Sequence, residues 1–396
     1  MTKQRGDLVV SSAVWGEEYV ERFLAYGLPT LIAPGNIPDV LRGHDVRLII
    51  GSTEDGIAKM RSHRLVGDSP PGLTIDFREM RIRSSPRFHM SEGMRFGIQE
   101  AIRTSALWSY SLADTIWPDG AFGRLVAQLS RHRAVMCHAH RLDQETLLPE
   151  LESRRQGSSL VISPAQFARF MIEHPHEELK LSEVTDSTLP GKPAAFIMLS
   201  PGRTAAVVRT HTWALLGIDF SRISSHDRES FQSRLFATTG DDTGIYAPIV
   251  HDLRNVYFST SSDDITCAGF DLWIDYSHRK TVPYSPGQLQ SAIYETVTSY
   301  QQNEWVDGLG RYLATVPFYI APGNDPEFCR RAVDLTQDIF TRAATVVWAA
   351  SPAAQRKPRR LKPLFLLPRW HPRRLVMGVV NRGRRRFLPP SSKPRD

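Results

Sequence analysis

Residues 106–125, ALWSYSLADTIWPDGAFGRL, decide how the fold is assigned. Residues 106–112 are mostly apolar and rich in aromatics, which predicts a buried strand. Asp114 follows at the carboxyl end of this strand, and Asp119 lies in the Asp-Gly turn beyond it. In an open α/β sheet the ligand crevice lies outside the carboxyl ends of the strands, so both carboxylates should face it. Two carboxylates suit Mg²⁺ or Mn²⁺, which would in turn hold a diphosphate. The alternative is a strand and an Asp-Gly turn without a function.

The residues before this stretch alternate between strand and helix patterns. The expected strands are 8–10, 46–53 and 73–82, and the expected helices are 17–28, 54–63 and 90–105. This order favours a parallel sheet with space for a nucleotide above its carboxyl edge.

The later residues predict a mixed sheet followed by helices. We expect a helix at 122–132, a strand at 133–138, a helix at 141–155, two apolar segments within 194–210, a hairpin-like pair of strands near 244–260, and helices at 285–302 and 326–350. The fold class is therefore α/β, with a catalytic or binding domain at 1–280, a helical region at 281–350 and a tail at 351–396.

The composition is that of an ordinary globular protein: 396 residues, 41% hydrophobic and 23% charged. No apolar run reaches the roughly 18 residues of a membrane-spanning helix, and the N-terminus lacks a secretory signal pattern, so we expect a cytoplasmic protein. Cys137, Cys267 and Cys329 are too few and too widely spaced for a disulfide framework or a zinc site. We expect them to be reduced and buried.

The basic residues are concentrated at the C-terminal end. Residues 356–396 contain fourteen Lys or Arg and one acid, within a whole-chain net charge of +7. Prolines at 358, 363, 368 and 372 prevent one long helix there. Cations interleaved with Leu, Phe and Trp favour contact with an anionic membrane surface through residues 356–395, and nucleic-acid binding is the second interpretation. A solvated, disordered tail is the third.

Three motifs give a resemblance to a known family. Residues 14–20 contain WGEEYV, residues 28–38 read LPTLIAPGNIP, and residues 113–120 follow the pattern AD-x(4)-DG. With these motifs, residues 8–260 loosely resemble GT-A-fold glycosyltransferases, and more narrowly certain bacterial sugar transferase-like proteins. The resemblance implies a GT-A-like, Rossmann-like mixed sheet flanked by helices, with a nucleotide-sugar site and an acidic metal-binding motif after the central strand.

The resemblance also implies the function and the metal ligands. It implies a glycosyltransferase that moves a sugar from a nucleotide-sugar donor to a glycan or lipid-linked acceptor, assisted by Mn²⁺ or Mg²⁺ at Asp114. A D-x-D motif would have its second acid at position 116, where this chain has Ile116. Asp119 and His211 are the remaining candidate ligands, although a histidine at a strand end also commonly caps a carbonyl. The alternative function is a non-catalytic GT-A-like binding protein that has lost the full motif.

The donor would meet residues that follow the first two strands. Trp15 and Tyr19 are candidates for stacking on the base, although aromatics at helical spacing are more often part of the core. Glu54 and Asp55 follow the second strand, where an acid can accept hydrogen bonds from ribose hydroxyls. Acids at a helix N-terminus are equally well explained by the helix dipole.

Two further patterns are candidates for catalysis or metal binding. Asp241 and Asp242, in TTGDDTG, could deprotonate an acceptor hydroxyl as a general base, and a solvated turn is the alternative. His138 and His140 alternate along a strand end, which allows both to face one cleft.

Overall fold

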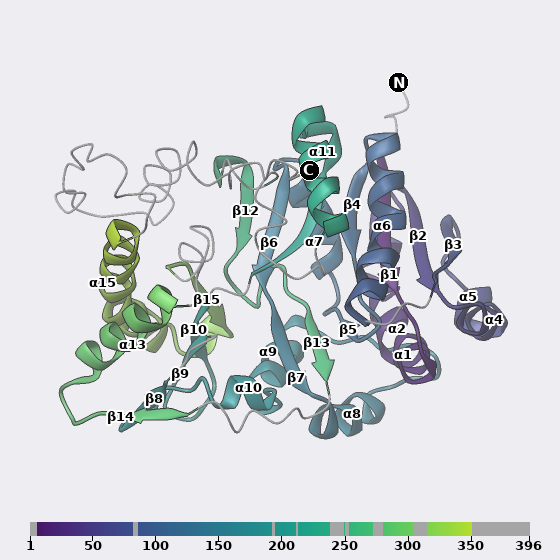
Figure 1. Ribbon diagram of the computed structural model, residues 1–396. Coiled ribbons are helices and arrows are strands. Elements are labelled where there is room, and N and C mark those ends of the chain that lie inside the picture. Colours follow the sequence, from purple (N-terminus) through teal and green to yellow (C-terminus); the bar gives the residue numbers. More distant parts are fainter. Residues whose placement is uncertain are drawn as a thin grey trace.

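The computed structural model describes residues 6–81, 86–191, 195–210, 213–237, 249, 253–271, 280–303 and 315–350. Its centre is a seven-stranded sheet (Figure 1). The strands, in spatial order, are β12 (Val256–Ser259), β6 (Ala134–His138), β11 (Trp213–Asp219), β4 (Leu107–Tyr110), β1 (Gly6–Ala13), β2 (His44–Ser52) and β3 (Leu73–Glu79). Only β11 runs antiparallel to its neighbours, β4 and β6, so the sheet is mixed.

Helices cover both faces of this sheet, which is why its strands are apolar on both sides. One face packs against α1 (Glu17–Arg22), the π-helical segment η1 (Phe23–Gly27), α2 (Leu28–Leu31), α3 (Ile37–Val40), α4 (Glu54–Ser62), α5 (Arg64–Gly67) and α7 (Ala121–Leu129). The other face packs against α6 (Pro86–Thr104) and α11 (Ser225–Ala237). Successive side chains of β1 therefore belong to different core clusters. Leu8 and Val10 pack with the first group of helices, and Val9 packs with the second.

Helix α6 lies unusually close to β1 because glycines face the strand. A Cβ atom at Gly97 would lie 1.9 Å from the Ser11 Oγ, and one at Gly93 would lie 2.4 Å from the Ala13 Cβ. Neither position has room for a side chain, so these two glycines set the distance between helix and strand.

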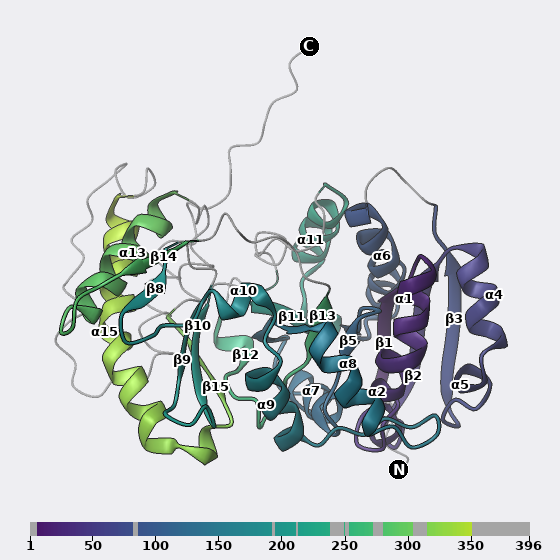
Figure 2. The ribbon, with the colours of Figure 1, turned by 90° about the horizontal axis from the view of Figure 1, so that it is seen from below.

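Three smaller sheets extend the molecule. They are β15 (Pro317–Ile320) with β10 (Ala206–Thr210) and β9 (Ala195–Leu199), β5 (Thr115–Ile116) with β13 (Ala268–Asp271) and β7 (His140–Asp143), and β14 (Thr281–Pro283) with β8 (Thr188–Pro190). The remaining elements are α8 (Gln144–Ser153), α9 (Pro164–Glu173), α10 (Glu177–Lys180), α13 (Leu289–Asn303), α15 (Pro326–Ala350), η2 (Phe220–Arg222), η3 (Leu253–Asn255) and η4 (Pro322–Asn324). Seen from below, α13 and α15 lie at one end of the molecule and α4 and α5 at the other (Figure 2).

Most predicted elements are confirmed, and two differ. The predicted helix 141–155 begins as a strand, because His140–Asp143 pairs with β13, a partner more than 120 residues away in the sequence. Of the pair of strands expected near 244–260, the structure describes β12, which pairs in parallel with β6. Residues 244–248, 250 and 251–252 lie outside the described residues.

The C-terminal region contributes two helices, as expected, and also two strands. β14 pairs with β8, and β15 pairs with β10, so both strands join sheets begun by earlier residues. The boundary at 280/281 stays a prediction, and the tail 351–396 lies outside the described residues. Within the described part of the chain, none of the helices combines the length and apolar character needed to cross a bilayer.

The three cysteines form no disulfide. Cys137 and Cys329 are buried as expected, whereas Cys267 is only partly buried. The pKa of Cys137 is raised well above its ordinary value, chiefly by a hydrogen bond with Cys267 and by burial.

Candidate functional site

The carboxyl edge of the main sheet contains a topological switch point. The chain runs outward from β1 to β2 and β3 on one side, and β4 then pairs with the opposite side of β1. Ligands of open α/β sheets bind at such a point, outside the carboxyl ends of the strands. The segments that follow β1, β2 and β4 carry Trp15, Glu54 with Asp55, and Asp114. Because these three strands run parallel, the fold brings these sequence-predicted residues to one edge of the sheet.

Asp114 is partly buried in the short connection between β4 and β5. Its backbone carbonyl accepts a hydrogen bond of 3.1 Å from the Phe270 N–H, at the start of the β5 to β13 pairing. Two residues later Ile116 is fully buried and packs with Tyr26 in a core cluster. The position where a D-x-D motif has its second acid therefore lies in the apolar core.

A hydrogen bond from a buried indole holds together the connection that carries Asp114. The Trp117 Nε1 donates to the Ser111 Oγ at 3.0 Å, and both residues are fully buried. The Ser111 N–H donates to the Ser11 carbonyl at 2.9 Å, which ties the start of the connection to β1. The Trp117 ring also packs edge-on against Phe122, with ring centroids 5.1 Å apart. Residues 111–117 therefore form a loop fixed at both ends.

Asp119 lies beside the turn at residues 33–36. Its Oδ1 accepts a hydrogen bond of 2.7 Å from the Gly35 N–H, and its own N–H donates to the Ile162 carbonyl at 2.7 Å. Among the described residues, no three His, Cys, Asp or Glu side chains are grouped to hold a metal ion. Mg²⁺ and Mn²⁺ often use one or two protein carboxylates together with substrate phosphates, so a site for either ion need not contain three such side chains.

Trp15 and Tyr19 form one aromatic cluster after β1. Their rings are stacked with centroids 5.8 Å apart, and the His89 ring meets Trp15 edge-on at 5.5 Å. The Arg22 guanidinium lies over the Tyr19 ring, 5.1 Å from its centroid. Trp15 and Tyr19 are both partly exposed, and each ring is engaged by the other and by one further side chain.

Glu54 and Asp55 are both exposed in the first turn of α4, directly after β2. The helix is capped by Thr53, whose side chain accepts a hydrogen bond from the Gly56 N–H at 3.3 Å. These acids are accessible to a ligand at the sheet edge, and the same position also suits the helix dipole.

His211, Asp241 and Asp242, the other predicted site residues, lie outside the described residues. His138 and His140 do not face an open cleft: both are buried, with ring centroids 5.3 Å apart, and His138 stacks on Phe318. Burial lowers the pKa of His138 well below its ordinary value, and His140 nearby lowers it further. Burial also lowers the pKa of His140 to about 4.

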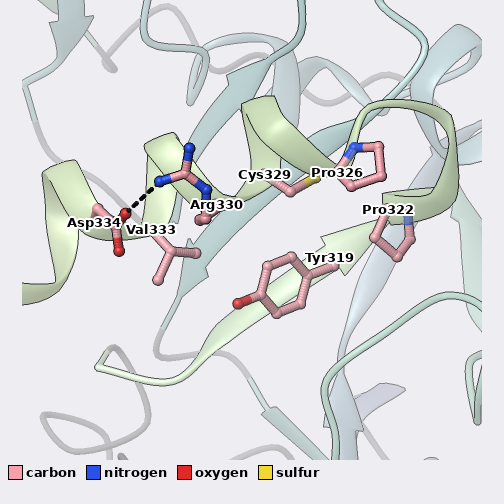
Figure 3. Close-up of a pocket in the computed structure, with 7 residues that line it drawn as sticks. All are labelled: Tyr319, Pro322, Pro326, Cys329, Arg330, Val333 and Asp334. Atoms are coloured by element: carbon pink, nitrogen blue, oxygen red, sulfur yellow. Dashed lines mark hydrogen bonds and ion pairs between the residues drawn. The ribbon is translucent and has the colours of Figure 1, made fainter. Parts of the chain in front are cut away.

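A small pocket lies away from these residues, between β15 and the start of α15 (Figure 3). Its volume is about 350 Å³. Its lining comes from three elements and their connections: Tyr319, Pro322, Pro326, Cys329, Arg330, Val333 and Asp334. None of the predicted site residues lines it.

The residues that hold the acidic segment in place, chiefly Ser111, Trp117 and Asn36, were not among the predicted site residues. Asn36 belongs to the APGN turn, which the sequence marks as a motif. Its role could not be predicted, because its partners Pro118 and Phe122 are more than 80 residues away.

No protein-family model and no curated protein sequence matches the chain, whereas solved structures do. The solved structures to which the chain is similar include glycosyltransferases.

One of these structures is the mannosyltransferase PcManGT from Pyrobaculum calidifontis, in complex with GDP-Man and Mn²⁺. It is 11% identical, with a TM-score of 0.33, over 96% of this chain and 81% of that one. TarS 1–349 from S. aureus, in complex with UDP-GlcNAc, is 8% identical, with a TM-score of 0.33, over 88% of this chain and 82% of that one. The bifunctional glycosyltransferase WbbM is 7% identical, with a TM-score of 0.31, and 66% of this chain spans only 39% of its length. At these identities and TM-scores the likeness is loose, so a function for this protein has to be inferred from its own residues.

Proposed function

We propose that this protein is a glycosyltransferase that moves a sugar from a nucleotide-sugar donor to a glycan or lipid-linked acceptor. The observation that carries the proposal is the position of Asp114, which follows β4 at the switch point between β1 and β4. A carboxylate at that edge is suited to meet a diphosphate through a divalent cation.

The motifs behind the family resemblance support the proposal, because two of them meet in space. The APGN turn at residues 33–36 contacts the AD-x(4)-DG segment through Asp119 and Asn36. The third motif, WGEEYV, supplies the partly exposed Trp15 next to β1. Two of the three motifs therefore belong to one structural unit, and the third follows β1 at the same edge of the sheet.

Each residue at the sheet edge has a proposed role in the reaction. Asp114, with His211 as a second candidate, would hold Mn²⁺ or Mg²⁺, and the cation would neutralise charge on the departing nucleoside diphosphate. Trp15 would stack on the base. Glu54 and Asp55 would accept hydrogen bonds from the ribose.

The acceptor side involves residues outside the described part of the chain. Asp241 or Asp242 would remove the proton of the acceptor hydroxyl as a general base. The basic segment 356–395 would hold the protein at the inner face of a membrane, near a lipid-linked acceptor.

A second candidate function is favoured by one observation, the complete burial of Ile116. Because this position is in the core, Asp114 has no neighbouring acid of the D-x-D kind. A protein with this arrangement could bind a nucleotide-sugar without transferring the sugar.

Thermal-shift measurements separate the two candidates. The intact chain is screened against UDP, GDP, CMP and TDP, with and without Mn²⁺, alongside Asp114→Ala. Stabilisation that needs both nucleotide and metal and is lost in Asp114→Ala supports the transferase. Stabilisation by nucleotide alone, unchanged in Asp114→Ala, supports the binding protein or a metal-free transferase. No stabilisation by any nucleotide would contradict both functions.

A further inference from the structure

We infer that Asp119 is a positioning residue: together with Asn36 it locks the turn at residues 33–36 onto the segment that carries Asp114, and it does not bind the cation itself. The inference rests on the proposed function, in which Asp114 is the metal ligand. It gives Asp119 a different role from the one that its acidic side chain suggests in the sequence.

The lock consists of hydrogen bonds between the two segments. The Asp119 Oδ1 accepts from the Gly35 N–H at 2.7 Å. The Asn36 Nδ2 donates to the Pro118 carbonyl at 3.2 Å, and the Asn36 Oδ1 accepts from the Phe122 N–H at 2.9 Å. Asn36 is fully buried, and its Nδ2 also donates to the Thr30 carbonyl at 2.8 Å. Its amide group is thus used on both its donor and its acceptor side.

The two segments also meet backbone to backbone. A Cβ atom at Gly35 would lie 2.8 Å from the Gly120 N and 2.9 Å from the Asp119 Oδ1. A Cβ atom at Gly123 would lie 2.9 Å from the Gly35 carbonyl oxygen. With no space at either glycine, the Asp119 carboxylate is held against the Gly35 amide.

The hydrogen bonds of Asp119 and Asn36 are linked to Asp114 because residues 113–119 lie against residues 27–35. The Ala113 carbonyl lies 3.0 Å from the position of a Gly27 Cβ, and the Trp117 N–H donates to the Thr30 Oγ1 at 3.2 Å. Residues 113–119 therefore contact residues 27–35 at three successive positions, and the third contact is the hydrogen bond between Asp119 and Gly35. Loss of this hydrogen bond would loosen the loop that positions Asp114.

The Asp119 side chain is itself engaged by the fold. Its Oδ1 accepts from the Gly35 N–H, and the Asp119 N–H donates to the Ile162 carbonyl, so both the side chain and the backbone of Asp119 are held by other residues. This is the arrangement expected of a supporting residue.

The experiment compares Asp119→Asn with Asp119→Ala in the full-length chain. An Asn side chain keeps an oxygen at Oδ1 for the Gly35 N–H and removes the negative charge with which an aspartate ligand attracts the cation, whereas Ala removes both. Asp114→Asn is the matched control for loss of a metal ligand. Two quantities are measured: hydrogen exchange of the Gly35 amide, and the Kd for Mn²⁺ in the presence of the nucleoside diphosphate that stabilises the protein most.

A positioning role predicts that Asp119→Asn changes the Mn²⁺ Kd by less than about threefold and leaves Gly35 exchange slow. Asp119→Ala should speed Gly35 exchange at least about tenfold and weaken Mn²⁺ binding about tenfold. Asp114→Asn should abolish Mn²⁺ binding without changing Gly35 exchange.

Several results would overturn the inference. Loss of Mn²⁺ binding in Asp119→Asn, with slow Gly35 exchange, would make Asp119 a ligand. An unchanged Kd in Asp119→Ala would remove the link to Asp114. If Asp119→Ala does not fold, Asp119→Asn alone still separates ligand from support. If the wild-type chain binds no metal with any nucleotide, the metal role of Asp114 fails and the positioning role fails with it, while Gly35 exchange still reports whether the turn at residues 33–36 is held by Asp119.

Discussion

The Trp117 indole donates to the Ser111 hydroxyl across the connection that carries Asp114, at an Nε1 to Oγ distance of 3.0 Å. Both partners are fully buried, so neither can replace the other with water without rearrangement. The bond joins two residues that are six positions apart in the sequence, and it holds the two ends of the loop together in the protein interior. It connects stability and function, because the same loop is the one that presents the proposed metal ligand.

This bond should be measurable as a coupling energy. Trp117→Phe leaves the buried Ser111 hydroxyl without its partner, which should lower the free energy of unfolding by about 1–3 kcal/mol. Ser111→Ala leaves the indole N–H unpaired at a similar cost. The double variant should cost less than the sum of the two, and urea unfolding of all four proteins measures the difference. Strict additivity would show that the bond does not stabilise the loop.

The close contact of α6 with β1 should make Gly97 intolerant of any side chain. A Cβ atom there would lie 1.9 Å from the Ser11 Oγ, so Gly97→Ala should lower the free energy of unfolding by about 1–3 kcal/mol. Gly67→Ala is the matched control, because a Cβ atom at Gly67 meets nothing within 4 Å. Chemical denaturation should show a loss only for Gly97→Ala, and equal effects of the two changes would contradict the packing explanation.

The buried pair His138 and His140 should make stability fall in acid. The pKa of both is lowered, that of His140 to about 4, so between roughly pH 6.5 and 4 the unfolded chain binds more protons than the folded one. Stability is therefore complete above about pH 6.5 and is lost as the pH falls, by about 3 kcal/mol for His140 alone.

Urea unfolding at a series of pH values tests this slope. His140→Gln should flatten it between pH 6.5 and 4, whereas His226→Gln, at an exposed position, should leave it unchanged. The same slope in His140→Gln and in the wild-type chain would exclude the pair as its cause.

Arg209 should resist replacement even by lysine. Its guanidinium is fully buried between β10 and α15, where it donates to the Thr315 carbonyl at 2.6 Å, the Gln337 Oε1 at 2.9 Å and the Thr336 Oγ1 at 3.2 Å. Burial lowers the pKa of Arg209 to about 10. A lysine ammonium cannot match this fork of donors, so Arg209→Lys should destabilise the protein by about 2–4 kcal/mol.

Arg64→Lys is the control for Arg209→Lys, since Arg64 pairs with Asp68 at the surface, where such pairs contribute little. Thermal unfolding of the two variants should show a clear loss for Arg209→Lys alone. Similar melting temperatures would mean that the guanidinium geometry is not needed.

The basic tail should bind anionic vesicles. Residues 356–396 carry fourteen cationic side chains, each expected to contribute about 1 kcal/mol near an anionic surface. Flotation with phosphatidylserine vesicles should recover the intact chain at low salt and lose it at high salt. A chain ending at Ser351 should stay unbound, and equal recovery of both chains would contradict the membrane proposal.

The alternation of strands and helices in the first half of the chain could be predicted from the amino-acid sequence, because apolar periodicity and helix-end signals are local properties. The sequence placed the strand before Asp114 and the helix after Asp119, and it marked the APGN turn as a motif. Local patterns also predicted α15, which begins at its helix-entry Pro326, and α13, which begins at Leu289, three residues after the expected entry at Pro286.

The contacts between those elements could not be predicted, because they depend on how the whole chain folds. The strand at His140–Asp143 exists because β13 pairs with it, and β15 joins a sheet begun by β9 and β10. The partner of Asp119 is Gly35, 84 residues earlier, and no local pattern specifies a contact over that separation. A carboxylate in a sequence can be interpreted as a metal ligand. Its role in the folded protein depends on which hydrogen-bond donors lie next to it.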